Sequence, residues 1–128
     1  PQFRHLFRGE IHTRLNDQRS LRFYEQDHET LGIPADDQFV VISEQLAGTL
    51  VLNPTYMGMN RSNDATIITV LLTAARPLDD KRTLVRAICD HTVKALGISP
   101  DDVFIALIPV PKENFSFGRG ELQLAAQA

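Results

Sequence analysis

Several residue types that define common protein classes are scarce in this chain. Only one of its 128 residues is a cysteine, Cys89, which excludes an internal disulfide bond and predicts a reducing compartment such as the cytoplasm. Lys and Arg number 13 against 16 Asp and Glu, so no basic excess attracts nucleic acid or an anionic membrane surface. No apolar run is long enough to span a bilayer, and no basic and apolar leader opens the chain. We therefore expect a cytoplasmic protein with no nucleic-acid partner and no membrane partner.

The motifs of metal and cofactor sites are missing as well. Gly118-Arg119-Gly120 lacks the lysine of a phosphate-binding loop. No serine lies in a nucleophile elbow, and Cys89 falls in the middle of a predicted helix, so neither a Ser–His–Asp nor a Cys–His arrangement can be argued. We expect no metal and no organic cofactor. The histidines, none of them at metal-ligand spacing from another, are His5, His12, His28 and His91.

The longest nearly uncharged apolar run is Ala65–Ala75, and it leads directly into Arg76-Pro77. Its core is β-branched or Leu at every position, so both faces of a strand here are apolar, which is typical of a central strand covered on both sides. The proline ends the strand. A cation at the carboxyl end of a buried strand is a natural site for a small anion, although its position alone also fits a solvated loop arginine.

The second half of the chain repeats the first. Each half reads as strand, helix and strand, with a helix expected from Asn16 or Asp17 to Gly32 and a better formed one after Leu78. The second helix places Leu84, Ala87, Ile88, His91 and Ala95 on one face. The matching segments are Leu78–Leu84 with Leu15–Leu21, Asp90-His91 with Asp27-His28, and, after a two-residue slip, Leu96–Ile105 with Leu31–Val40.

This repeat predicts an α+β fold in which two tandem β-α-β units form a four-stranded mixed sheet with two helices on one face. We expect one domain over residues 1–128, with halves of about 1–63 and 64–128. The strands are predicted at Gln2–Arg8, Gln38–Ser43, within Ala65–Ala75, and from Val103, with Gly9–Arg14 as a loop. Leu50–Leu52 and Leu122–Leu124 are possible short strands.

Two helices on one face leave the other face of the sheet bare, although the strands are apolar on both. Because a monomer does not tolerate so much exposed apolar surface, we expect a homo-oligomer that buries the second face.

Few residues remain that could carry chemistry. Pro1, if it is the mature N-terminus, has a free secondary amine, and a model α-amino group titrates at roughly 7.7–8.0, so it can move protons near neutral pH. Burial or a nearby cation favours the neutral base, whereas a nearby carboxylate favours the charged acid. A frayed, inert terminus is the alternative. The other candidates are Arg76, Asp37, Phe115 and Phe117, whereas Glu44, Asn53 and Arg61 are polar residues that the sequence does not place.

Four features in order resemble the tautomerase superfamily, and within it the malonate semialdehyde decarboxylase family. They are Pro1 before a strand, the doubled strand–helix–strand unit, the strand end Ala75-Arg76-Pro77, and the loop Phe115–Gly118. The resemblance covers essentially the whole chain. It implies a homotrimer in which the sheets pack inward and the helices face outward.

The resemblance also implies roles for single residues. Pro1 matches the catalytic amine, Asp37 the catalytic aspartate, and Arg76 the arginine that holds the substrate carboxylate. Phe115 and Phe117 match the aromatic pair that walls the pocket. Two positions depart from the family pattern: Leu78 stands where some members have a second arginine, and Phe115 stands where tryptophan is frequent. By itself Asp37 also fits a polar link between helix and strand, and the two phenylalanines also fit core or subunit contacts.

The implied function is a cofactor-independent enzyme that uses the Pro1 amine on small oxo acids. A charged Pro1 fits decarboxylation of malonate semialdehyde, with hydration of activated acids as a further possibility, whereas a neutral Pro1 fits enol–keto tautomerisation of phenylpyruvate. The alternatives are a tautomerase only, and a non-catalytic trimeric binder of small carboxylates. In each case the partner is a small carboxylate, and no cofactor is needed.

Overall fold

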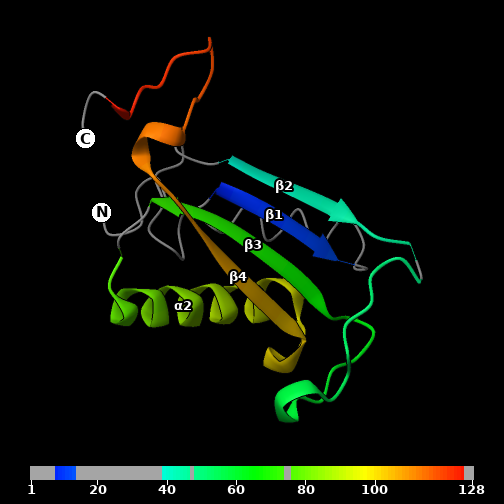
Figure 1. Cartoon of the computed structure of the whole chain (residues 1–128). Helices are drawn as coiled ribbons and strands as arrows, with labels where there is room; N and C mark the ends of the chain where they lie inside the picture. Colours follow the sequence, from blue (N-terminus) through cyan, green and yellow to red (C-terminus); the bar gives the residue numbers. More distant parts are fainter. Residues whose placement is uncertain (1–7, 14–38, 47, 74–75, 126–128) are drawn as a thin grey trace.

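The computed structural model describes residues 8–13, 39–46, 48–73 and 76–125, and in them four strands form one mixed sheet (Figure 1). The strand order is β2-β1-β3-β4, with β1 parallel to β2, β3 parallel to β4, and β1 antiparallel to β3. The predicted four-stranded mixed sheet of two parallel pairs is therefore confirmed. The elements are β1 Arg8–Thr13, β2 Phe39–Glu44, β3 Thr66–Thr73, α2 Leu78–Leu96 and β4 Val103–Val110, with short 3₁₀ turns η2 Tyr56–Gly58, η3 Pro100–Asp102 and η4 Lys112–Asn114.

Strand β3 is the centre of the core, as its apolar sequence predicted. Thr66, Ile68, Val70 and Leu72 are almost completely buried on the side of the sheet that α2 covers. Because β3 hydrogen-bonds to β1 on one side and β4 on the other, its backbone is satisfied along both edges. A strand paired on both edges and buried on one full face is rigid, so the residues that follow it are held in fixed positions.

Helix α2 begins directly after Pro77 and ends at Gly97. Pro77 is its N-cap, and Asp79 and Asp80 lie in the first turn, where the helix dipole favours negative charge. Gly97 adopts a left-handed conformation with φ 68°, and its N–H donates to the carbonyl of Val93. The predicted face is confirmed: four of its members are buried, and Ala87 is half-buried at its margin. The buried members are Leu84, Ile88, His91 and Ala95.

Three sequence predictions of local structure were wrong. Residues from Gly9 to Thr13, expected in a loop, belong to β1, because pairing with β2 and β3 on both sides overrides the weak strand preference of this polar segment. Leu50–Leu52 and Leu122–Leu124 are not strands. Neither segment belongs to the sheet, and a short segment without a paired neighbour does not hold the extended conformation. The expected first helix and the expected strand up to residue 7 lie outside the described residues.

The sheet face opposite α2 exposes large apolar residues on its two outer strands, whereas the register places Arg8, Glu10 and His12 of β1 on the same face. In-register residues share a face, which groups Phe39 and Val41 of β2 with Phe104 and Ile108 of β4, at 42–53% exposure. The half-buried Ile67 and Leu71 lie between them on β3. We call this surface the open face, and it has the apolar character that the bare-face argument predicted. Within the described ranges, no helix combines the length and the hydropathy that crossing a bilayer requires.

Candidate active site

One end of the sheet gathers the start of two strands and the end of the other two. Arg8, the first residue of β1, pairs with Phe39, the first residue of β2, and with Leu71 near the end of β3. Thr73 pairs with Val110 where β3 and β4 end together. Figure 1 shows this end also meeting the start of α2. We call it the site edge, because Arg76 and the two aromatic candidates follow directly from it.

Arg76 lies between the end of β3 and the start of α2. Its side chain is half-buried, and Nη2 donates to the hydroxyl oxygen of Thr73 at 3.3 Å. Thr73 is itself buried at the last position of β3, so the guanidinium is tied to the most rigid strand. In the described part of the chain no carboxylate forms an ion pair with Arg76. A partly desolvated guanidinium without an acidic partner is suited to bind a carboxylate, with two parallel hydrogen bonds where the geometry allows.

The aromatic residues follow the end of β4. After η4, Phe115 is buried and Phe117 is half-buried, and their rings are stacked with centroids 5.7 Å apart and planes 2° apart. The ring of Phe39 lies 5.6 Å from that of Phe117, tilted by 38°. Three rings from two distant segments thus form one apolar wall at the site edge. Sequence reasoning found Phe115 and Phe117 but missed Phe39, whose signal was a large aromatic at the first position of a strand, two residues after Asp37.

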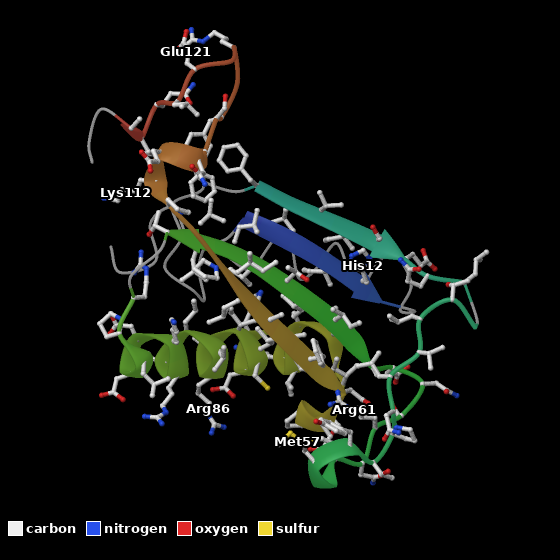
Figure 2. All side chains as sticks on the ribbon, in the orientation of Figure 1. His12, Met57, Arg61, Arg86, Lys112 and Glu121 are labelled. Carbon is white, nitrogen blue, oxygen red and sulfur yellow. The ribbon has the colours of Figure 1, made fainter. Side chains whose placement is uncertain are left out.

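Gln123 fixes the loop that carries the aromatic pair. Its side-chain oxygen accepts from the backbone N–H of Phe117 at 3.0 Å, and its side-chain nitrogen donates to the carbonyl of Gly118 at 3.1 Å. Gly118 has φ 141°, which favours glycine, so the loop turns sharply just after Phe117. Figure 2 shows Lys112 and Glu121 of this segment at the end of the sheet opposite Arg61. No sequence motif marked Gln123.

The polar candidates that the sequence did not place lie at the other end of the sheet. Glu44 is the last residue of β2, which begins at the site edge and ends at the opposite end of the sheet. The backbone N–H of Arg61 donates to Pro54, and its guanidinium lies 6.0 Å from the ring centre of Phe104, at the start of β4. Asn53 immediately precedes Pro54. None of the three therefore belongs with Arg76.

Leu78, which stands where a second arginine was considered, is the exposed first residue of α2 and adds no charge. Pro1 and Asp37 lie outside the described residues. The counterpart of Asp37 in the internal repeat, Asp102, is described, and it is buried. Its two carboxylate oxygens accept from the backbone N–H and the hydroxyl of Ser62, both at 2.7 Å, just before β3 begins. Asp102, just before β4, therefore holds the segment that precedes β3, the strand that pairs with β4.

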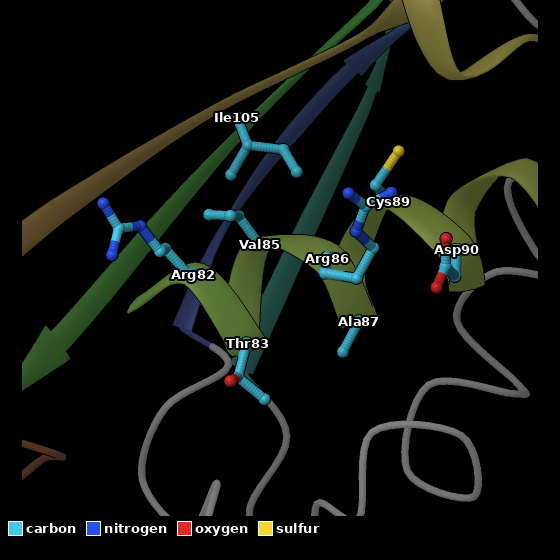
Figure 3. Close-up of a pocket in the computed structure, with 8 residues that line it drawn as sticks. All are labelled: Arg82, Thr83, Val85, Arg86, Ala87, Cys89, Asp90 and Ile105. Carbon is cyan, nitrogen blue, oxygen red and sulfur yellow. The ribbon is translucent and has the colours of Figure 1, made fainter. Parts of the chain in front are cut away.

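A depression of about 800 Å³ lies beside α2 and is lined by residues of that helix and by Ile105 of β4 (Figure 3). It contains the thiol of Cys89, and burial, together with the nearby charge of Asp90, raises the pKa of that thiol despite the opposing effect of Arg86. A thiol with a raised pKa is protonated at neutral pH and is a poor nucleophile. Among the described residues no three His, Cys, Asp or Glu side chains group as a metal site requires.

Comparison with known proteins agrees with this architecture. Residues 37–118 match a family described as tautomerase enzyme, a span that contains Asp37, Arg76, Phe115 and Phe117. The probable tautomerase YusQ of Bacillus subtilis (strain 168) is 31% identical over 96 residues, which cover 75% of this chain and 76% of that protein.

Solved structures share the fold over nearly the full length. Malonate semialdehyde decarboxylase, solved in wild-type, mutant and inactivated forms, superposes with a TM-score of 0.80 at 25% identity, covering 94% of this chain and 97% of that one. A symmetric trimer of fused 4-OT superposes with a TM-score of 0.75 at 17% identity, covering 94% and 98%. The chain is therefore an enzyme of the tautomerase superfamily, related in structure to malonate semialdehyde decarboxylase.

Proposed function

We propose that this enzyme uses the amine of Pro1 on small oxo acids, without a cofactor, and that it is malonate semialdehyde decarboxylase-like with hydratase and phenylpyruvate enol–keto tautomerase activities. The observation that carries the proposal is Arg76, a half-buried cation with no acidic partner among the described residues, fixed to Thr73 at the end of the sheet from which the segment with the stacked rings also follows. A carboxylate binds the guanidinium, and the carbon chain of the substrate lies along the rings.

The β1–β3 register supports a position for Pro1 at the same edge. Arg8 pairs with Leu71, and each step back along β1 corresponds to one step forward along β3. We propose that Pro1 lies at this edge too, so that its amine and the guanidinium of Arg76 stand on either side of one small substrate.

The internal repeat supports a role for Asp37 beside Pro1. We propose that residues 1–128 form one domain of two matching halves, in which Leu78 matches Leu15 and Asp64 therefore corresponds to Pro1. Asp102, the counterpart of Asp37, binds Ser62, two residues before Asp64 and four before the start of β3. By analogy we propose that the carboxylate of Asp37 serves the start of the chain. Because Asp37 is two residues before Phe39, its Cα lies within about 7.6 Å of the Cα of Phe39, at the site edge.

The chemistry then follows from the charge on Pro1. A carboxylate close to the amine favours the charged form, which donates to the carbonyl oxygen of the substrate. Arg76 holds the carboxylate turned out of the plane of the chain, the bond to that carboxylate breaks, and its electrons form the enol as CO₂ leaves. Protonation at carbon, with the enol hydroxyl returning its proton to the nitrogen of Pro1, completes the aldehyde. The solved relative supports this assignment, since its structures address decarboxylase and hydratase activities and include a mutant with alanine in place of its first proline.

The open face supports a homotrimer. Besides Phe39 at the site edge, it exposes Val41, Phe104 and Ile108 on the two outer strands, and a second copy would cover these three residues. The solved symmetric trimer of fused 4-OT, which has the same fold, supports the assembly that we propose. Sedimentation equilibrium at micromolar concentration should give three times the protomer mass of 14.3 kDa. A monomer would contradict the assembly. The lone Cys89 also agrees with the cytoplasmic location that we propose.

The test of function uses three variants and two substrates, malonate semialdehyde and enol phenylpyruvate. Pro1→Ala and Arg76→Ala should each reduce kcat/KM by at least about a hundredfold, because each removes an interaction with the reacting groups. Arg82→Ala, an exposed arginine paired only with Asp79 in the described structure, is the matched control and should retain full activity. Full activity in either of the first two variants would reject the scheme.

The pH profile distinguishes the two versions of the reaction. If Pro1 acts as an acid, kcat/KM falls as the pH rises through its pKa, and if it acts as a base, kcat/KM rises through that pKa. NMR titration of Pro1 labelled with ¹⁵N gives the same pKa directly. Agreement of the two values assigns the profile to Pro1, whereas disagreement assigns it to another group.

A further inference from the structure

We propose that Phe39 determines substrate specificity by holding the ring of Phe117 and by offering its own ring to the substrate, which makes the site selective for carboxylates with an aryl substituent. This inference rests on the proposed function only in taking the site edge as the place where a carboxylate binds. Phe39 belongs to the site through its ring contact with Phe117.

The first step is the position of Phe39. It is the first residue of β2, and its in-register partner is Arg8, so it lies at the site edge and not in the middle of the open face. Backbone pairing of β2 with β1 fixes the Cα of Phe39, and side-chain freedom is limited to two torsions. A ring in this place is therefore a rigid part of the site.

The second step is the geometry of the three rings. Phe115 is buried, Phe117 is half-buried, and Phe39 is 46% exposed, so burial decreases from the core outward along the row. Phe115 and Phe117 are parallel, whereas Phe39 is inclined by 38° to Phe117. Another ring prefers offset or tilted contact at centroid separations of roughly 4.5–7 Å, and rings at two inclinations offer both. The exposed side of Phe39 is the apolar area that such a ligand covers.

The charges of the site also favour such a ligand. Arg76 is one cation. Leu78 occupies the position where a second arginine would favour a substrate with two carboxylates, and its side chain carries no charge. A ligand with a carboxylate at one end and an apolar group at the other therefore fits a site with one guanidinium and three aromatic rings. A 2-oxo acid with an aryl group on its third carbon has this chemistry, whereas an unsubstituted three-carbon acid has no ring to place against Phe39.

The experiment measures binding without relying on turnover. Dissociation constants for 3-phenylpropanoate and propanoate are measured by calorimetry on the wild type, Phe39→Ala, Phe39→Tyr and the control Val41→Ala. Val41 lies on the same strand and the same open face with 53% exposure, but it is two residues further from the site edge. The wild type should bind the aryl acid at least about tenfold more tightly than propanoate.

In Phe39→Ala this preference should fall by about three- to tenfold, with binding of propanoate unchanged, and Phe39→Tyr should restore it. Val41→Ala should retain it. Where the wild type turns over both substrates, the same ratio should appear in KM for enol phenylpyruvate against malonate semialdehyde, with kcat little affected. Sedimentation of each variant shows whether assembly has changed.

Two results overturn the inference. The first is an equal loss of affinity for both acids in Phe39→Ala. The second is a loss of the aryl preference that occurs together with dissociation of the subunits and that Val41→Ala reproduces, since Phe39 would then be a subunit contact. Failure of the proposed function gives a different result from failure of this inference. If the aryl preference depends on Phe39 but turnover does not depend on Pro1, the proposed chemistry is wrong and the role of Phe39 in specificity still holds.

Discussion

Replacement of Asp102 should destabilise the protein more than any other single change to an acidic residue described in the structure. Asp102 is 2% exposed, and its two oxygens accept two hydrogen bonds of 2.7 Å from Ser62, one from the backbone N–H and one from the hydroxyl. These bonds join η3, before β4, to the segment before β3, so they connect the starts of two paired strands.

The magnitude follows from the two bonds. A hydrogen bond to a charged group contributes about 1.5–3 kcal/mol, and Asp102→Ala also leaves the N–H of Ser62 without an acceptor. We expect a loss of about 3–5 kcal/mol in the free energy of unfolding. Ser62→Ala removes the hydroxyl bond to Asp102 and the bond that the same hydroxyl accepts from the backbone N–H of Asp64, and it should cost about 1–2 kcal/mol. Asp101→Ala, which removes one bond to the backbone N–H of Asn60, should cost about 1 kcal/mol.

The assay is urea unfolding followed by far-UV circular dichroism, because the chain has no tryptophan to report by fluorescence. All variants are compared at one protomer concentration, since assembly stabilises the folded state by mass action. The two neighbouring aspartates make a matched pair, with Asp102 buried and Asp101 half-buried. A loss for Asp102→Ala no greater than that for Asp101→Ala would refute the reasoning.

Three other predictions test the loop, the helix end and the cysteine. Gln123→Ala removes both side-chain bonds that hold Phe117 and Gly118, so it should lower kcat/KM for enol phenylpyruvate severalfold with little change in thermal stability, and unchanged kinetics would contradict the bracing role. Gly97→Ala should cost about 1–2 kcal/mol in urea unfolding, because the new methyl group meets no atom within 4 Å but φ remains 68°; a neutral substitution would show that the helix end relaxes. The raised pKa of Cys89 leaves little thiolate at pH 8, so iodoacetamide should modify it more slowly than free cysteine, and a faster rate would show that the burial argument is wrong.

Much of the candidate site could be predicted because its signals are local. An apolar run that ends in Arg76-Pro77 specifies a buried strand followed by a fixed cation, and two phenylalanines in a glycine-containing loop specify an aromatic pair near the end of the next strand. Phe39 and Gln123 could not be found in this way. Their roles depend on contacts with Phe117 across a large separation in sequence, or across a turn whose shape no motif records.

The sequence by itself determined the central strand β3, the buried face of α2 and the parallel pairing of strands within each half, because periodicity and capping residues act over a few positions. Only the tertiary structure decided that residues Gly9–Thr13 form a strand, since their backbone groups are satisfied by β2 and β3 and not by anything local. It also decided which end of the sheet is the site edge. The antiparallel meeting of the two halves brings the starts of β1 and β2 to the ends of β3 and β4, and that placement depends on long-range hydrogen bonds that no local pattern encodes.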